Sequence, residues 1–183
     1  MAKTVLITGI SASGKSTLGA RLENDLLKSG LNGVRLLDGE AIRSELKKRG
    51  HHFGYTVADR NKVVLEYAHI ASKLNNEGIN CILCCIAHVE KTRETMRAVI
   101  GDVMEVYLDC PVQNCAKRDY KEQYAKAFKG LLDDFVGVTT PYQKSDSIDL
   151  ILYTGRDSVE RCSEILLEST IAFLENSKLD GPR

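Results

Sequence analysis

The clearest chemical signal in the chain lies in Gly9–Ser16, where the residues follow the spacing G-x-x-x-x-G-K-S. Gly9 and Gly14 allow backbone conformations that residues with a Cβ rarely adopt, so successive N–H groups can point inward around a phosphate chain. Lys15 supplies a mobile cation for the outer phosphates, and the Ser16 hydroxyl can bind Mg²⁺. The motif therefore predicts a site for the phosphates of ATP together with Mg²⁺.

Two acidic residues, Asp38 and Glu40, directly follow the apolar run Val34–Leu37. In an open parallel sheet, ligands bind beyond the carboxyl ends of the strands, so these side chains could serve as a base for a substrate hydroxyl and as a Mg²⁺ ligand. The alternative is an N-cap and an acidic first turn for a helix that begins near Ala41. The phosphate-binding motif upstream favours the active-site interpretation.

These residues need a sheet to hold them, and the hydrophobic pattern predicts one. Apolar runs predict strands at Val5–Ile7, Val34–Leu37, Ile79–Ile86, Val103–Leu108 and Leu150–Tyr153. Helical periodicity follows these runs at residues 15–27, 41–48, 57–76, 88–99 and 158–175. Alternating strands and helices indicate parallel pairing with helices on both faces. We therefore expect an α/β three-layer sandwich with a mostly parallel sheet, the phosphate-loop strand at its centre, and one domain over residues 1–183.

Composition narrows the choice of partner. Lys+Arg and Asp+Glu number 25 each, so no net charge favours nucleic acid or a membrane surface, and a small-molecule partner is expected. The first residues enter a strand without a signal-like apolar segment, and no stretch is long and apolar enough for a membrane span. A cytoplasmic location follows as an expectation, and the tail from Asn176 is expected to be frayed.

Six cysteines raise the question of a metal or redox site. Cys81, Cys84 and Cys85 lie within one predicted strand. Strand positions three apart point to opposite faces, so Cys81 and Cys84 could not hold one ion. We interpret the cysteines as small buried hydrophobic residues in a reducing compartment.

A basic helical segment spans about residues 115–137 and includes Arg118 and Lys121. One interpretation is a solvated amphipathic helix pair with Tyr120, Tyr124 and Phe128 on its inner face. The other is a helical lid that folds over the bound triphosphate, with Arg118 and Lys121 adding positive charge near the transferred group.

Several separate segments of the chain together resemble the adenylylsulfate kinase family, whose members phosphorylate the ribose 3′-hydroxyl of adenosine 5′-phosphosulfate to 3′-phosphoadenosine 5′-phosphosulfate. The resemblance covers about residues 3–155 and rests on the loop Gly9–Thr17, Leu37–Arg43, Gly54–Thr56 with Asp59 and Arg60, Cys115–Lys121 leading to Tyr124, and Asp134–Gly137 leading to Pro141 and Tyr142. It implies a homodimeric P-loop kinase that uses ATP and Mg²⁺.

The resemblance also implies roles for individual residues. The catalytic residues would be Lys15, Asp38, Glu40 and Lys121. ATP would be bound by Gly9, Ser11, Ala12, Ser13, Gly14, Lys15, Ser16, Thr17, Arg118 and Thr154. The acceptor nucleotide would be bound by Asp38, Arg43, Tyr55, Arg60, Ile86, Lys121 and Phe135, with Tyr55 and Phe135 on either side of its base. Mg²⁺ would be held by Ser16 and Asp38.

The chain departs from the family pattern mainly on the acceptor side. Glu40 and Ala41 replace the usual Asp and Asn, and Ala87 and His88 stand where Ser and Pro are usual. The Asn and arginines that normally follow Arg60 are replaced by Val63, Leu65 and Glu66. Two alternatives therefore stay open: a kinase of the same family that acts on another 5′-modified nucleotide, such as the cytidine diphosphoramidate of capsule modification, and a nucleotide-dependent ATPase or switch without an acceptor.

Overall fold

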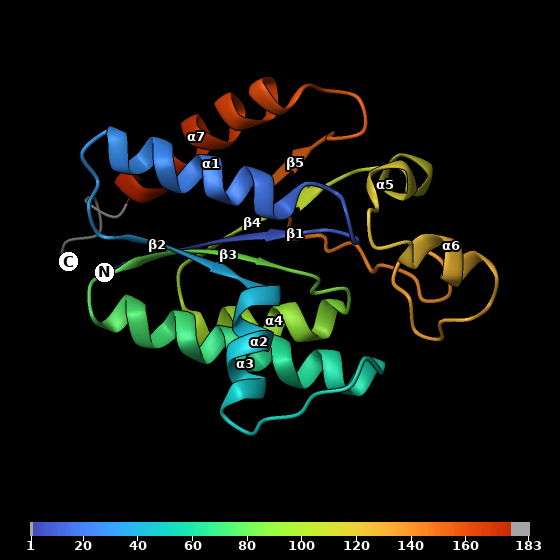
Figure 1. The fold of residues 1–183 in the computed structure, drawn as a ribbon. Coiled ribbons are helices and arrows are strands. Elements are labelled where there is room, and N and C mark those ends of the chain that lie inside the picture. The colour runs from blue at the N-terminus through green and yellow to red at the C-terminus, as the bar shows by residue number, and fades with distance from the viewer. Residues whose placement is uncertain (1, 177–183) are drawn as a thin grey trace.

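The computed structural model describes residues 2–176, so the predicted frayed tail beyond Asn176 lies outside the described residues. At its centre is a parallel sheet whose strands are β1 (Thr4–Thr8), β2 (Val34–Asp38), β3 (Asn80–Cys85), β4 (Val103–Leu108) and β5 (Leu150–Leu152). The strand order is β2-β3-β1-β4-β5, and Figure 1 shows the strands running side by side between two helical layers. The strand that leads into the phosphate-binding motif is central, as predicted.

Helices cover both faces of the sheet (Figure 1). One layer contains α1 (Lys15–Lys28) and α7 (Val159–Glu175), and the other contains α2 (Gly39–Lys48), α3 (Val57–Asn76) and α4 (Glu90–Ile100). Two short helices, α5 (Val112–Arg118) and α6 (Gln123–Phe128), lie at one side, beyond the carboxyl ends of the strands. The α/β three-layer prediction is therefore confirmed, with a sheet that is parallel throughout the described residues. None of the helices in residues 2–176 has both the length and the apolar composition that a bilayer-spanning segment needs.

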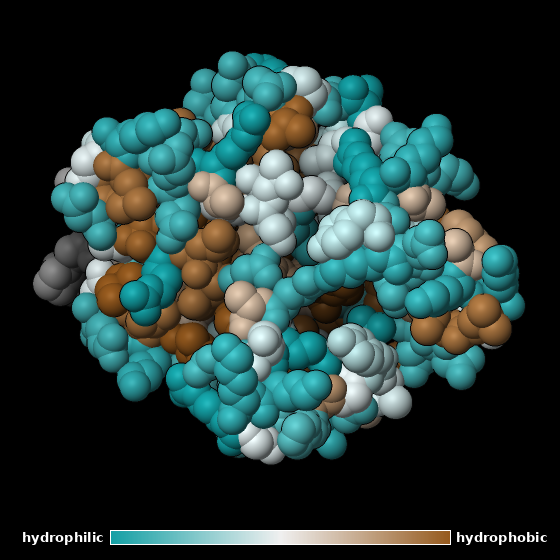
Figure 2. All heavy atoms as spheres, viewed as in Figure 1, coloured by the Kyte–Doolittle hydropathy of each residue, from teal (hydrophilic) through white to brown (hydrophobic). Residues whose placement is uncertain are grey.

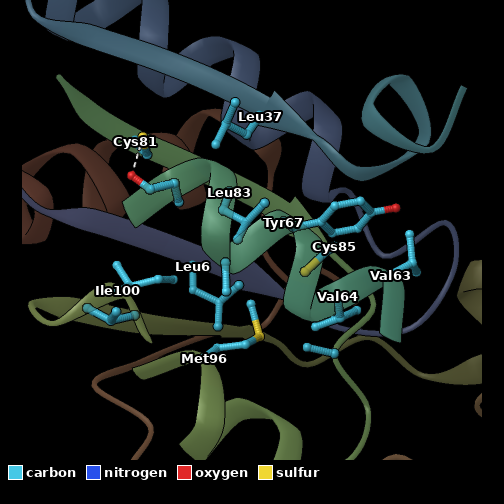
Figure 3. Packing of buried hydrophobic residues seen from close by; sticks show 14 residues of the cluster. Leu6, Leu37, Val63, Val64, Tyr67, Cys81, Leu83, Cys85, Met96 and Ile100 are labelled. Atoms are coloured by element: carbon cyan, nitrogen blue, oxygen red, sulfur yellow. Dashed lines mark hydrogen bonds between the residues drawn. The ribbon is translucent and has the colours of Figure 1, made fainter. Parts of the chain in front are cut away.

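The strands place alternate side chains in two separate apolar clusters, because successive side chains of a strand point to opposite faces. Leu6 packs with Leu83 and Met96 beneath α3 and α4, as Figure 3 shows, whereas the flanking Val5 and Ile7 pack beneath α1 and α7. The same alternation separates the cysteines: Cys81 and Cys85 are in the first cluster, and Cys84 is in the second. The prediction that they are buried and point to opposite faces is confirmed.

Helix boundaries differ slightly from the prediction, and capping explains the differences. The second helix begins at Gly39 rather than Ala41, because the Asp38 side chain accepts hydrogen bonds from the backbone N–H groups of Glu40 and Ala41. The fourth begins at Glu90 rather than His88, since the backbone carbonyls of Ala87 and His88 accept bonds from Arg93 and Gln143 and lie outside the helix.

A buried ion pair joins α4 to the sheet. The side chains of Arg93 and Glu105 are each 1% exposed, and Arg93 Nε lies 2.9 Å from Glu105 Oε1. The other guanidinium nitrogens of Arg93 donate to the carbonyls of Ala87 and Gln143, both at 2.6 Å. Glu105 also pairs with Arg97 at 3.1 Å. The pair thus holds the loop that follows β3 against the segment near Gln143.

Replacing Glu105 with Gln is expected to lower the free energy of unfolding by about 3 kcal/mol, because the buried Arg93 charge would lose its counterion. Urea unfolding followed by circular dichroism measures the change. Glu94→Gln, which removes an exposed carboxylate paired with Lys91, is the matched control and should leave the midpoint unchanged. Equal midpoints for the two variants would contradict the structural role given to the buried pair.

Candidate active site

The loop Gly9–Gly14 connects β1 to α1 and has the backbone geometry of a phosphate cradle. Gly9 and Gly14 have φ angles of +151° and +104°, and Ala12 has φ +56°, a left-handed conformation that is uncommon for a residue with a Cβ. Gly14 precedes the first residue of α1 without a side-chain cap, which leaves N–H groups at the helix start available to an anion.

Lys15, the first residue of α1, bends back over this loop. Its Nζ donates to the carbonyl of Ile10 at 2.6 Å. Burial removes the ammonium group from water and lowers the pKa of Lys15. A partly buried cation that is held by a neutral carbonyl favours the binding of an anion beside it.

Asp38 serves as a helix cap and also reaches the phosphate loop. One carboxylate oxygen, Oδ1, accepts from the N–H groups of Glu40 at 2.9 Å and Ala41 at 3.3 Å. The other, Oδ2, accepts from the Ser16 hydroxyl at 2.5 Å. The two interpretations of Asp38 that the sequence left open therefore describe the same side chain, whose two oxygens have different partners.

Ser16 and Asp38 also fit a magnesium ion chemically. A hydroxyl and a carboxylate in direct contact are hard oxygen ligands, and Mg²⁺ in nucleotide sites takes one or two such groups together with phosphate oxygens and water. Ser16 is the second residue of α1, directly after Lys15, and Asp38 reaches it from the end of β2.

Glu40 meets a residue from the basic segment. Lys121, between α5 and α6, places its Nζ 2.9 Å and 2.7 Å from the two carboxylate oxygens of Glu40. This contact raises the pKa of Lys121. Because the Glu40 side chain is 79% exposed, the pair is weak and can be exchanged for contacts with a ligand.

Two arginines form the far side of the site. Arg43 donates to the carbonyls of Phe53 and Gly54, and Arg60 donates to the carbonyls of Tyr55 and Asp134. Their guanidinium carbons lie 4.7 Å and 5.6 Å from the centre of the Tyr55 ring, which is 66% exposed. Burial and the nearby Arg43 charge lower the pKa of Arg60, so an anion bound here would relieve the repulsion between the two cations.

These groups line one cavity of about 1000 Å³. Figure 2 shows that this face of the molecule is hollowed near its centre, with hydrophilic residues around the opening. The lining includes most of the residues expected from the sequence: Ser11, Ala12, Ser13, Gly14, Lys15, Ser16, Thr17, Asp38, Glu40, Arg43, Tyr55, Arg60, Ile86, Arg118, Lys121 and Thr154. The structure thus brings the phosphate loop, the two acids and the two arginines together.

Gly9 and Phe135 are expected site residues that do not line the cavity. Phe135 packs edge-on against the buried Tyr124 with ring centroids 4.9 Å apart. Thr154 lines the cavity, but its hydroxyl donates to the Ser13 carbonyl at 2.8 Å, so it contacts the loop itself.

Sequence reasoning missed several residues of the site. Tyr67, assigned only to an apolar stripe, donates its hydroxyl to the Gly39 carbonyl at 2.8 Å. Tyr124 does the same for the Ser11 carbonyl. His51 and His52, left unassigned, lie in the cavity lining near Lys47. The periodicity of a helix marks such tyrosines as apolar, and it gives no signal for the partner of the hydroxyl.

A phosphate loop after the central strand, acids at the end of β2 in the same sheet and a basic helical segment beyond the same edge define a P-loop kinase. A family model described as adenylylsulphate kinase matches residues 1–153. The chain therefore belongs to the adenylylsulphate kinase family.

Individual relatives agree with this assignment. An adenylyl-sulfate kinase of Synechococcus sp. (strain JA-3-3Ab) is 32% identical over 166 residues, which is 91% of this chain and 92% of the relative. One from Deinococcus deserti is 36% identical and spans 91% and 90% of the two chains. Among solved structures, the APS kinase of Mycobacterium tuberculosis in complex with AMPPNP and APS has a TM-score of 0.83 and 32% identity, over 95% of this chain and 98% of that one.

Proposed function

We propose that this protein transfers the terminal phosphoryl group of ATP to the ribose 3′-hydroxyl of adenylyl sulfate, which produces 3′-phosphoadenosine 5′-phosphosulfate. The observation that carries the proposal is that the phosphate loop faces two acids and two arginines across one cavity. Support also comes from the relatives named adenylyl-sulfate kinase and from the similar Mycobacterium tuberculosis kinase, whose complex contains an ATP analogue and APS.

On the ATP side, backbone N–H groups of Ser11 to Gly14 and the start of α1 bind the phosphates, and Lys15 leaves the Ile10 carbonyl to neutralise their charge. Arg118 lines the same cavity, with its guanidinium held by the Thr154 carbonyl at 2.8 Å. It is placed to add positive charge as the phosphoryl group moves.

Ser16 and Asp38 would hold Mg²⁺ through their oxygens. When bound, this ion supplies positive charge that screens the phosphates and favours transfer. The donor set supports this part of the proposal, since both groups are hard oxygen ligands.

The two acids have different tasks in this mechanism. Asp38 is held by two backbone N–H groups and by Ser16, which suits a fixed ligand. Glu40 is exposed and contacts the exposed Lys121, so it can turn toward an acceptor hydroxyl and accept its proton as the oxygen attacks in line. Lys121, once released from Glu40, contacts the transferred group.

On the acceptor side, Arg43 and Arg60 bind the anionic groups of the nucleotide, and the exposed Tyr55 ring stacks on its base. Ile86 adds an apolar wall. Phe135 contacts the opposite face of the base after the segment that carries it moves toward the cavity.

Arg60→Met is expected to raise the KM for adenylyl sulfate about tenfold or more, because a charge-assisted contact to the acceptor is lost. The KM for ATP should stay within twofold of the wild-type value. Initial rates with each substrate varied in turn measure both constants. Lys62→Met, an exposed lysine on the same helix, is the matched control. A higher KM for ATP together with an unchanged KM for the acceptor would show that Arg60 contributes to ATP binding and not to acceptor binding, which contradicts the proposal.

The acceptor itself is tested with purified protein, ATP, Mg²⁺ and a panel of nucleotides, with ADP release as the readout. Turnover with micromolar adenylyl sulfate is the expected result. Turnover only with another 5′-modified nucleotide, such as cytidine diphosphoramidate, would reassign the substrate. ADP release that is independent of every acceptor would indicate an ATPase or switch.

Residues 115–137 act as a lid in this proposal, because Arg118 and Lys121 line the cavity. The helices α5 and α6 lie beyond the carboxyl ends of the strands (Figure 1). One kinase domain over residues 1–183, working as a homodimer, follows from the family resemblance and is tested by light scattering.

The six cysteines are free and buried, which suits the reducing cytoplasm as the place of action.

A further inference from the structure

Two hydroxyl groups from outside the phosphate loop hold its backbone. The Tyr124 hydroxyl donates to the Ser11 carbonyl at 2.8 Å, and the Thr154 hydroxyl donates to the Ser13 carbonyl at 2.8 Å. In a trans peptide the carbonyl and the next N–H point in opposite directions. Each hydroxyl therefore sets the direction of the following N–H group, that of Ala12 and that of Gly14.

Both of these N–H groups suit an anion. Within residues 2–176, neither has a hydrogen-bond acceptor in the protein, and both residues line the cavity. Ala12 also holds a left-handed conformation that costs free energy for a residue with a Cβ. The hydrogen bond from Tyr124 to the preceding carbonyl helps to maintain that conformation.

Tyr124 is itself firmly placed, and it connects the loop to the acceptor side. It is 1% exposed, and its backbone N–H donates to the Asp119 carboxylate at 2.7 Å, which ties α6 to the end of α5. Its ring meets the Phe135 ring edge-on, with 4.9 Å between centroids. The Asp134 carbonyl, one residue away, accepts from Arg60 at 3.1 Å.

We infer that Tyr124 is a positioning residue that holds the Ser11–Ala12 peptide with its N–H toward the phosphates and links this peptide through its ring to Phe135. Movement of Phe135 onto a bound acceptor would therefore shift Tyr124 and, through it, the Ser11–Ala12 peptide that faces the ATP phosphates. The helix α6, which contains Tyr124, connects the two sites. The inference deepens the proposed kinase function: it rests on ATP binding at the phosphate loop, and it rests on the acceptor site only for the role of Phe135.

The test measures binding of AMPPNP with Mg²⁺ by isothermal titration calorimetry, without an acceptor. Tyr124→Phe keeps the ring and removes the hydroxyl, so it should raise the Kd for AMPPNP about five- to tenfold, the effect of one lost hydrogen bond. Thr154→Val should raise the Kd similarly, whereas Thr154→Ser, which keeps a hydroxyl, should restore binding. The thermal unfolding midpoint of each variant is recorded in parallel.

Tyr142→Phe is the matched control, because it removes a tyrosine hydroxyl that bonds the Thr8 side chain at 2.9 Å rather than a loop carbonyl. It should leave the Kd for AMPPNP within twofold of wild type. Wild-type binding by Tyr124→Phe, or an equal loss in Tyr142→Phe, would overturn the inference.

The link to Phe135 is tested by a double-mutant cycle. Phe135→Leu alone should raise the Kd for AMPPNP about threefold, and it should add little when Tyr124 is already Phe, because the two changes share one path. Additive effects of the two substitutions on the Kd, or no effect of Phe135→Leu, would contradict the proposed link between Tyr124 and Phe135. All these measurements use the ATP side only, so they keep their meaning even if adenylyl sulfate proves not to be the acceptor.

Discussion

Replacing Lys15 with Met is expected to lower kcat about 1000-fold while the protein remains folded. Lys15 is partly buried, and its ammonium group donates to the neutral carbonyl of Ile10 in the same loop, so its charge contributes little to the fold. Burial lowers the pKa of Lys15 because it disfavours the charged ammonium group, and a bound phosphate would supply a counter-charge. The loss should therefore fall on phosphoryl transfer and on ATP binding rather than on stability.

A coupled assay of ADP release with adenylyl sulfate, together with urea unfolding, measures both quantities for this variant. Lys126→Met, an exposed lysine of α6, is the matched control and should keep the wild-type rate. Near-normal turnover by Lys15→Met would show that the phosphates bind elsewhere, and the whole site assignment would then be wrong.

Asp38→Asn is the second variant with a large expected effect, because it separates the two tasks of this side chain. The amide oxygen can still accept from the N–H groups of Glu40 and Ala41, and Asn is as good an N-cap as Asp. The negative charge beside Ser16 is lost, so kcat should fall about 100- to 1000-fold at saturating Mg²⁺. The free energy of unfolding should stay close to that of wild type.

Asp38→Ala completes the design. It removes the cap as well as the charge, and it should lose about 1 kcal/mol of stability in addition to the activity. Urea unfolding and the coupled assay measure both variants side by side. If Asp38→Asn kept full activity, the carboxylate would be a helix cap only, and Glu40 would be left as the single acid in the mechanism.

The sequence could predict much of this fold because its signals are local. The apolar strand before Gly9, the amphipathic helix after Lys15 and the alternation of strands and helices each depend on neighbouring residues. Alternation along a strand was enough to place Cys81 and Cys84 on opposite faces, and the two clusters confirm it. Local signals predicted the first residue of a helix less accurately. Ala87 and His88 lie outside α4 because their carbonyls accept from Arg93 and Gln143, about 6 and 55 residues away along the chain.

The sequence by itself determined the class of chemistry, because the phosphate motif and its flanking strand and helix lie within one short segment. Tertiary structure alone decided which distant groups complete the site. Tyr124 reaches Ser11 across 113 residues, and Lys121 reaches Glu40 across 81. The physical reason is that a hydrogen bond depends on distance and direction in space, and only the packing of the sheet, the helices and the lid segment brings these donors and acceptors together.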